Sequence, residues 1–374
     1  MAAFLIMILD FADRLLYNKI YKTGYCNERS VKKMKYITFV VPSYNSQDYL
    51  ERCVNTLMPE NEDVEIIIVN DGSTDKTAEI ADRYHEKYPN TVQVIHKENG
   101  GHGSALNTGL KAAQGIYFKC VDSDDWLDTA LLKKLLDQIK QWDSSHTRVD
   151  LIICNYIYDH LYENKKKVIS YNNVFKKNEI MTWEDIGHFL PSQYILMHAT
   201  FFRTDILKKS GVVLPEHTFY VDNIFAHQPL SFTSTICYLD LDMYHYFIGR
   251  ADQSVNEKVM MKRIDQQIRV TKIIMERVMT ERERQAPKKL RKYLVRNLSI
   301  MLTISDIHLL MINDAEAYSK RKELWDTVKE RDYKMYRYLK HRTMSGATYL
   351  PGGKVGGCIT VIMYKMVRPF YKFN

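Results

Sequence analysis

Cysteine is scarce in this chain and follows no pairing pattern. The 374 residues contain six cysteines, and no two have the Cys-x-x-Cys spacing that zinc and redox sites use. Two of them, Cys120 and Cys154, lie inside apolar segments that favour buried strands. We therefore expect reduced core cysteines in a cytoplasmic protein, and no zinc site.

Long apolar runs, internal repeats and low-complexity tracts are also absent from the sequence. The first run, Ala2–Leu9, stops at Asp10, far short of the roughly 20 residues that span a bilayer. It has neither a basic flank nor a cleavage-site pattern, so we expect no signal peptide and no transmembrane span. Residues 1–33 are an extension that either forms a short amphipathic anchor or is dispensable, with Met34 as the native start.

Acidic residues are sparse in the last third of the chain. From Glu257 to Asn374 there are 26 Lys and Arg against 12 Asp and Glu, which gives +14, whereas 27 against 33 gives −6 in the remainder. Apolar residues recur there at helical spacing on both sides of Pro287. We expect two or three amphipathic helices in a basic region over residues 256–374.

Several partners suit such a basic region. Its end, Ile359–Tyr371, mixes apolar and basic side chains as an interfacial segment does, so an anionic membrane surface is one candidate. Ordinary packing helices with a solvated basic face would look the same. An unpaired apolar face could instead bury against a second copy, giving a homo-oligomer. Nucleic acid is not expected, because no motif that reads it accompanies the charge.

Short apolar runs alternate with helical patterns in the first half of the chain. The runs are rich in β-branched residues and favour buried parallel strands; they are Tyr36–Val41, Val64–Val69, Val92–Ile95, Ile116–Val121 and Val149–Cys154. The helical patterns between them are Gln47–Leu57, Asp75–Tyr88, Ser104–Ala113 and Asp128–Trp142, and Asp128 can cap the first turn of the last one. This order predicts an α/β fold with a doubly wound, mostly parallel sheet.

Acidic turns follow two of these strands. Asp71 comes after Val69, and Asp122 and Asp124 come after Val121. Open α/β sheets bind ligands at the carboxyl ends of their strands. A nucleotide sugar needs an acceptor for its base or ribose, which Asp71 can supply, and a divalent ion for its diphosphate, which Asp122 and Asp124 can hold as carboxylate ligands of Mn²⁺ or Mg²⁺.

The order of the polar motifs resembles the inverting family-2 glycosyltransferases with the GT-A fold. The motifs that carry the resemblance are Pro42-Ser-Tyr-Asn45, Asn70-Asp-Gly-Ser-Thr-Asp75, Asn99-Gly-Gly101 with Asn107-Thr-Gly109, and Asp122-Ser-Asp-Asp125. The resemblance covers roughly residues 34–255, which we take as the glycosyltransferase domain. It implies nucleotide contacts at Pro42, Tyr44, Asn45 and Asp71, and a metal-binding Asp-x-Asp at Asp122 and Asp124.

A glycine-rich segment, Glu98–Ser104, precedes a helical pattern. Its backbone can approach a diphosphate or a sugar because no Cβ intervenes at Gly101, and His102 and Asn107 are further candidates for contact with the donor. A flexible loop with a helix cap would have the same sequence. Leu106 stands where many relatives carry an arginine before the asparagine.

An inverting transferase needs a base to take the proton of the acceptor hydroxyl. Asp222 resembles the second acid of the pair that precedes a helix in this family, and Val221 replaces the first acid. The alternative role for Asp222 is a helix cap. His198, upstream of it, fits a packed core histidine better than a ligand.

Residues Gly249–Asn256 resemble the loop that closes over the donor diphosphate, with contacts from Arg250 and Gln253. A polar turn without a ligand fits the same residues.

These features predict a metal-dependent inverting glycosyltransferase. It would move a sugar from a nucleotide sugar, UDP-linked by expectation, to a cell-surface glycan or lipid-linked acceptor at the inner face of the plasma membrane. Three alternatives stay open: a glycolipid synthase acting on a membrane lipid, a nucleotidyltransferase, and an inactive protein that only binds nucleotide sugars.

Overall fold

The computed structural model describes residues 34–58, 63–160, 163, 165–190, 193–249, 257–350 and 353–371. The chain from Lys35 onward forms one compact unit. The predicted N-terminal anchor in residues 1–33, and the predicted contact residues Arg250 and Gln253, lie outside the described residues.

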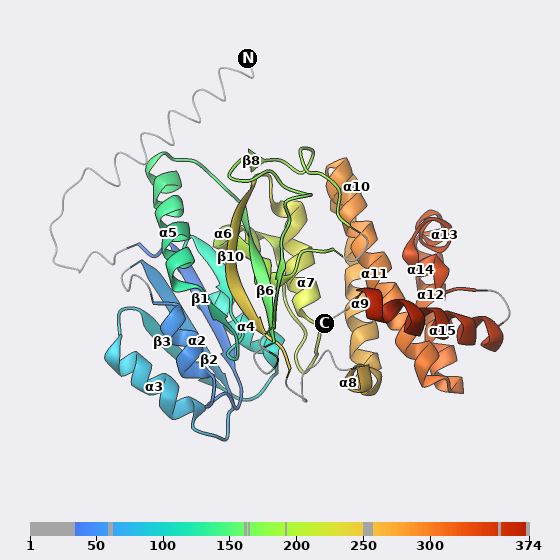
Figure 1. Cartoon of the computed structure of the whole chain (residues 1–374), viewed down its shortest axis with the longest axis horizontal. Helices are drawn as coiled ribbons and strands as arrows, with labels where there is room; N and C mark the ends of the chain where they lie inside the picture. Colours follow the sequence, from blue (N-terminus) through green and yellow to red (C-terminus); the bar gives the residue numbers. More distant parts are fainter. Residues whose placement is uncertain are drawn as a thin grey trace, which may run out of the picture. The chain divides into compact units, whose positions relative to one another are not determined.

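A mixed β-sheet is the centre of this unit (Figure 1), with the strand order β3-β2-β1-β4-β9-β6-β10-β5. Its strands are β1 (Ile37–Ser43), β2 (Val64–Asp71), β3 (Val92–Lys97), β4 (Tyr117–Cys120), β5 (Trp126–Leu127), β6 (Leu151–His160), β7 (Lys165–Ile169), β8 (Ile180–Met181), β9 (Thr200–Arg203) and β10 (Ile236–Phe247). The first four strands pair in parallel. Every residue of β1 and β2 is buried, as expected of strands covered on both faces.

Helices alternate with the parallel strands as predicted. They are α2 (Leu50–Thr56), α3 (Thr77–Lys87), α4 (His102–Ala112) and α5 (Thr129–Ser144), followed later by α6 (Thr204–Ser210) and α7 (Asp222–His227). The side chain of Asp128 accepts a hydrogen bond of 2.9 Å from the backbone N–H of Leu131, which confirms it as the cap of α5.

The sheet differs from a purely parallel one beyond β4. Strand β9 lies between β4 and β6 and runs antiparallel to both, whereas β6 and β10 pair in parallel. The run Val149–Cys154, which forms the start of β6, was expected to be a parallel strand. That prediction is right for its pairing with β10 and wrong for its pairing with β9.

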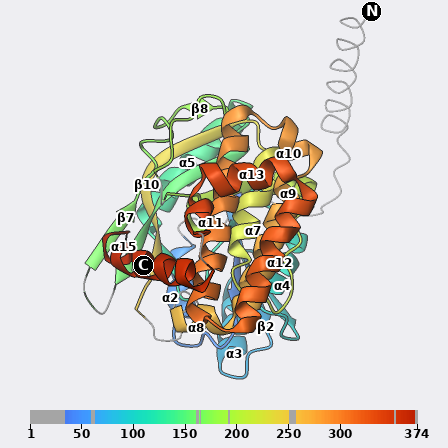
Figure 2. The ribbon, with the colours of Figure 1, turned by 90° about the vertical axis from the view of Figure 1, so that its right-hand side faces the viewer.

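The basic region is helical throughout the part that the structure describes (Figure 2). Its helices are α8 (Glu257–Lys262), α9 (Ile264–Val278), α10 (Glu281–Gln285), α11 (Lys288–Ile312), α12 (Ala315–Arg331), α13 (Tyr333–Arg342), α14 (Met344–Ala347) and α15 (Lys354–Tyr371). Pro287 directly precedes α11, so the predicted break is confirmed. We expected two or three helices and missed the caps Asp314 and Asp332, which bind the N–H groups of Ala317 and Met335.

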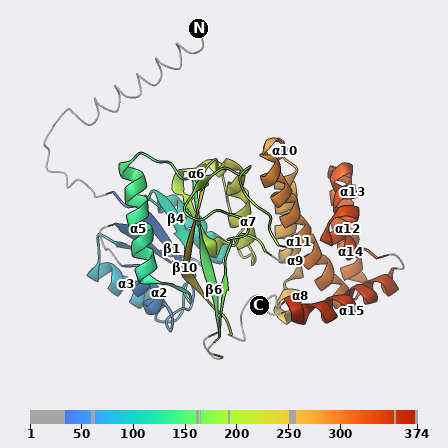
Figure 3. The same cartoon turned by 45° about the horizontal axis from the view of Figure 1, so that its top comes forward.

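Helix α11 joins this region together. It packs against α9, α12, α14 and α15, and α9 in turn lies beside α7 (Figure 3). By length and composition alone α11 could cross a membrane, but a buried core helix meets the same criterion, so the expectation of no transmembrane span stays a prediction. In the structure 67% of its most apolar window is buried among the neighbouring helices.

Candidate active site

The loops after β1 and β2 are tied together at the edge of the sheet. Ser43 and Asn70 are partners in the register, so the residues that follow them lie side by side. The side-chain carbonyl of Asn45 accepts a hydrogen bond of 2.9 Å from the N–H of Thr74. Asn45 has a φ of 49°, a left-handed conformation that asparagine tolerates well. The side chain of Tyr44 is 54% exposed, which leaves its ring open to a ligand.

Asp71 holds the glycine-rich loop. One carboxylate oxygen accepts from the N–H of Gly100 at 3.0 Å and the other from the N–H of Gly101 at 2.7 Å. Lys97 donates to the same carboxylate at 2.8 Å and forms an ion pair with it. The carboxylate thus shapes the loop, and its contact with a base or ribose stays a prediction.

The glycine-rich loop is joined to the segment that leads into α7. Gly101 has a φ of 84°, and a Cβ there would lie 3.2 Å from the backbone nitrogen of His217, so a side chain would not fit. The amide of Asn107 donates to the carbonyl of Leu214 at 2.8 Å and accepts from its N–H at 2.9 Å. Asn107 thus braces this segment, and its contact with a donor stays a prediction.

Asp222 lies in the first turn of α7, near the charged groups of His102 and Asp122. The helix cap is Val221, which makes no side-chain cap bond, so the alternative role of Asp222 as the cap is wrong. Burial raises the pKa of Asp222 to about 6; the positive charge of His102 opposes this shift and the negative charge of Asp122 adds to it. A carboxylate with such a pKa is ionised near neutral pH and is more basic than a solvated one.

His102 and Asp122 form a pair across the site. The Nε2 atom of His102 lies 2.9 Å from Oδ1 of Asp122. Burial alone would lower the pKa of His102, but the charge and hydrogen bond of Asp122 outweigh it, so the pKa is raised. Burial alone would raise the pKa of Asp122, and His102 lowers it below its usual value. Each partner therefore favours the charged form of the other.

The acidic loop is anchored from two sides. Asp125 is completely buried and accepts hydrogen bonds from the Tyr244 hydroxyl and from the N–H of Phe247 at 2.8 Å. Arg52 donates to the main-chain carbonyl of Asp124 at 2.6 Å, and its guanidinium lies 4.0 Å from the centre of the Trp126 ring. These contacts hold the backbone of the acidic loop in place at the end of β4.

Two groups of side chains in the described chain could hold a metal ion, and both contain Asp122. One joins it to His102 and Cys120, the other to Asp125 and His198, with the candidate ligand atoms of each group within 4.8 Å of one another. Carboxylate and imidazole donors suit Mn²⁺, and the Nδ1 atom of His198 is buried without a hydrogen-bond partner. The residues present therefore fit a divalent ion. Asp124 is in neither group, and its role as a ligand stays a prediction.

His198 and Lys119 extend the site beneath the acidic loop. His198 is packed as predicted, its ring stacked 4.7 Å from that of Tyr244, and burial lowers its pKa to about 4. Lys119 is completely buried, donates to the carbonyls of Met197 and His198, and burial lowers its pKa to about 7. The sequence analysis missed Lys119, although a lone charge inside the run Ile116–Val121 was a signal.

A comparison with family models matches residues 38–204 of this chain to the model described as glycosyl transferase family 2. The match spans the first four parallel strands and ends after β9, so it contains the loops that carry Asp71, His102 and Asp122.

Among curated proteins, the chain is similar to the uncharacterized glycosyltransferase EpsJ of Bacillus subtilis (strain 168). The two are 30% identical over 216 residues, which are 56% of this chain and 60% of EpsJ. It is also 30% identical over 174 residues to the minor teichoic acid biosynthesis protein GgaB of the same organism, covering 45% of this chain and 18% of GgaB. The chain thus spans about three-fifths or less of the length of these relatives.

Among solved structures, the chain is similar to residues 1–349 of S. aureus TarS in complex with UDP-GlcNAc. The match has a TM-score of 0.61 and 20% sequence identity, and it covers 90% of this chain and 91% of the TarS chain. At this identity the match concerns the fold, a GT-A sheet with a helical C-terminal region.

Proposed function

Since the chain carries a glycosyl transferase family 2 domain over residues 38–204, we propose that it is a metal-dependent inverting glycosyltransferase. The single observation that carries the proposal is the convergence of Asp222, His102 and Asp122, which come from α7, the start of α4 and the end of β4. We further propose a division into an extension (1–33), a transferase domain (34–255) and a helical region (256–374).

Asp222 would act as the base that accepts the proton of the attacking acceptor hydroxyl. Its burial supports this role, because a carboxylate with a raised pKa takes up a proton more readily as the new bond forms. The pair of His102 and Asp122 lies near enough to act electrostatically on Asp222. The sugar donor would lie between them, so that the hydroxyl attacks the anomeric carbon from the side of Asp222.

Asp122 and Asp124 would hold Mn²⁺ or Mg²⁺, with His198 as a nearby nitrogen donor. When bound, the ion would supply charge neutralisation for the diphosphate leaving group. Asp71 holds the backbone of the glycine-rich loop in place. Because Gly101 has no side chain, the donor could approach this backbone closely.

The donor is proposed to be a UDP-sugar. Support comes from the TarS complex with UDP-GlcNAc, which shares this fold, and from the exposed ring of Tyr44 beside the strand end that carries Asp71. Pro42, Tyr44, Asn45 and Asp71 would contact the nucleoside; Gly101, His102, Asn107, Arg250 and Gln253 would contact the diphosphate and the sugar.

The acceptor is proposed to be a cell-surface glycan or its lipid-linked precursor. GgaB, a similar protein, is named for minor teichoic acid biosynthesis, which supports a cell-wall polymer. Such precursors would meet this chain in the cytoplasm, at the inner face of the plasma membrane, and a glycolipid synthase would require the same location.

Thermal stabilisation by ligands tests this proposal. The protein is heated with UDP, GDP and dTDP and with the corresponding nucleotide sugars, with and without Mn²⁺. We expect a manganese-dependent rise in the melting temperature with the uridine compounds, and a loss of that rise in Asp122→Asn. No shift with any nucleotide would contradict the proposed function.

A further inference from the structure

Helix α15 carries large apolar side chains on its outer face. They recur at positions i, i+4, i+7, i+8 and i+11, which is one side of a helix: Val355 (67% exposed), Ile359 (46%), Ile362 (56%), Met363 (51%) and Met366 (60%). Exposed apolar residues are unremarkable when scattered singly, but a continuous stripe marks a contact surface.

The inner face of α15 is built from small residues instead. Gly356, Gly357 and Thr360 are buried, and the Thr360 hydroxyl donates to the carbonyl of Gly356. A Cβ on Gly357 would lie 2.8 Å from Cδ2 of Leu310, so a larger residue there would force the Leu310 side chain of α11 to move. The helix is therefore docked by its small face. Because the small face packs inward, the bulky apolar stripe on the other side of the helix faces outward.

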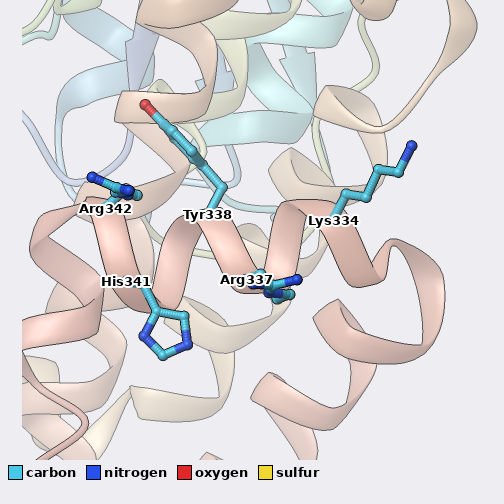
Figure 4. Close-up of a pocket in the computed structure, with 5 residues that line it drawn as sticks. All are labelled: Lys334, Arg337, Tyr338, His341 and Arg342. Carbon is cyan, nitrogen blue, oxygen red and sulfur yellow. The ribbon is translucent and has the colours of Figure 1, made fainter.

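The end of the chain that contains the stripe is strongly basic in sequence. From Tyr333 to Asn374 the chain has eight Lys and Arg and neither Asp nor Glu. Helix α13 concentrates this charge around an open hollow of about 350 Å³ (Figure 4), lined by Lys334, Arg337, Tyr338, His341 and Arg342. Helices α13 and α15 both face the viewer in Figure 2.

We propose that α15 lies in the headgroup region of an anionic lipid bilayer, with its apolar stripe among the acyl chains and the basic residues of α13 near the lipid phosphates. An interfacial helix needs an apolar face flanked by cations, and both are present here. A second copy is a poorer occupant, because two segments of eight positive charges and no acid would repel each other. The inference deepens the proposed function, on which its biological meaning rests, by naming the surface that brings the transferase to a lipid-linked acceptor.

Vesicle flotation tests this surface. The full chain is mixed with vesicles of phosphatidylcholine alone, or with about 30% phosphatidylglycerol, at physiological salt. The double variant Ile362→Glu with Met363→Glu places charge in the stripe, and we expect it to lower binding to anionic vesicles by about tenfold or more. The matched control, Val168→Glu with Ile180→Glu, changes two exposed apolar residues (45% and 43%) on β7 and β8 and should bind as the unaltered chain does.

A second pair of variants tests the charge. Arg337→Ala with Arg342→Ala should weaken binding to anionic vesicles by roughly tenfold and flatten its dependence on salt. Lys165→Ala with Lys167→Ala, on the exposed strand β7, removes the same charge elsewhere and should change little.

Three results would overturn the inference. Binding that is equal for the stripe variant and the unaltered chain would place the contact elsewhere, and so would binding that is equal for neutral and anionic vesicles. Sedimentation that shows a dimer dissociated by the stripe variant, without vesicle binding, would identify a second copy as the occupant. Circular dichroism confirms that the variants fold. These assays contain no donor and no metal. A negative result would therefore contradict the membrane inference without bearing on the proposed transferase activity.

Discussion

The Nε2 atom of His102 lies 2.9 Å from Oδ1 of Asp122, and this contact joins the start of α4 to the end of β4. His102 also acts on Asp222, because its positive charge opposes the rise in the pKa of Asp222 that burial causes. His102 lowers the pKa of Asp122, which favours the charged form that a metal ligand needs, whereas burial keeps the pKa of Asp222 raised for proton transfer.

The pH dependence of transfer should report the ionisation of Asp222. A base works only when it is deprotonated, and the pKa of Asp222 is raised to about 6, so kcat/KM should rise with pH up to about 6 and then level off. Since the charge of His102 lowers this pKa, His102→Asn should move the rise to higher pH. His217→Asn, at a neighbouring exposed histidine with a φ of 48° that asparagine tolerates, is the control. An unshifted profile in His102→Asn would contradict the coupling.

Metal binding should depend on the acidic loop. Asp122→Asn and Asp124→Asn should each weaken Mn²⁺ binding in the presence of UDP by about tenfold or more, because carboxylate ligands carry the charge that the ion requires. The spectrum of free Mn²⁺ in electron paramagnetic resonance measures this. Asp82→Asn, a half-exposed acid paired with His96, should leave the affinity unchanged. Unaltered Mn²⁺ binding in Asp124→Asn would remove that residue from the ligand set.

Asp306 should be essential to the stability of the helical region. It is completely buried, accepts hydrogen bonds from Trp325 (2.9 Å) and Thr348 (2.6 Å), and lies 3.3 Å from the Arg321 guanidinium. Asp306→Ala leaves these donors unpaired, and we expect a loss of about 3–5 kcal/mol in the free energy of unfolding by urea. The exposed Asp326→Ala is the control and should cost under about 1 kcal/mol. A small effect in Asp306→Ala would show that the buried cluster does not hold these helices together.

Local signals made much of the fold predictable. Asp128 as a cap and Pro287 as a break were read correctly because each acts on its own turn of helix. The antiparallel direction of β9 was not foreseen, because its pairing with β4 and β6 depends on tertiary packing and not on the four residues of the strand itself. The acidic residues of the site could be predicted because they directly follow the apolar runs that form strands.

The contacts between distant segments could not be predicted in the same way. Asp71 was expected to meet a nucleotide, and nothing local showed that its carboxylate binds the glycine-rich loop. The nearness of Asp222 to His102 depends on Asn107 bracing Leu214, a contact across 107 residues of sequence. Such contacts form only when the sheet has assembled, and the spacing of residues in one sequence does not predict them.

Acid should weaken folding through His227. This side chain is buried, its Nε2 atom has no hydrogen-bond partner, and burial lowers its pKa to about 4. The unfolded chain, with an ordinary histidine pKa near 6.5, binds the proton first, so stability is full above about pH 6.5 and falls as the pH drops toward 4. For this residue we expect a loss on the order of 2 kcal/mol at pH 5. His227→Gln should remove that part of the pH dependence in urea unfolding; an unchanged dependence would mean that His227 is not the responsible group.

The most direct test of the account is the variant Asp222→Asn, measured for sugar transfer and for UDP binding in the same preparation. The substitution keeps the shape of the side chain and removes its basicity. The account predicts a fall in kcat of about 10²–10⁴-fold with the dissociation constant for UDP and Mn²⁺ nearly unchanged. Transfer that continues at the normal rate would contradict the assignment of Asp222 as the base, and loss of UDP binding together with activity would make the residue structural.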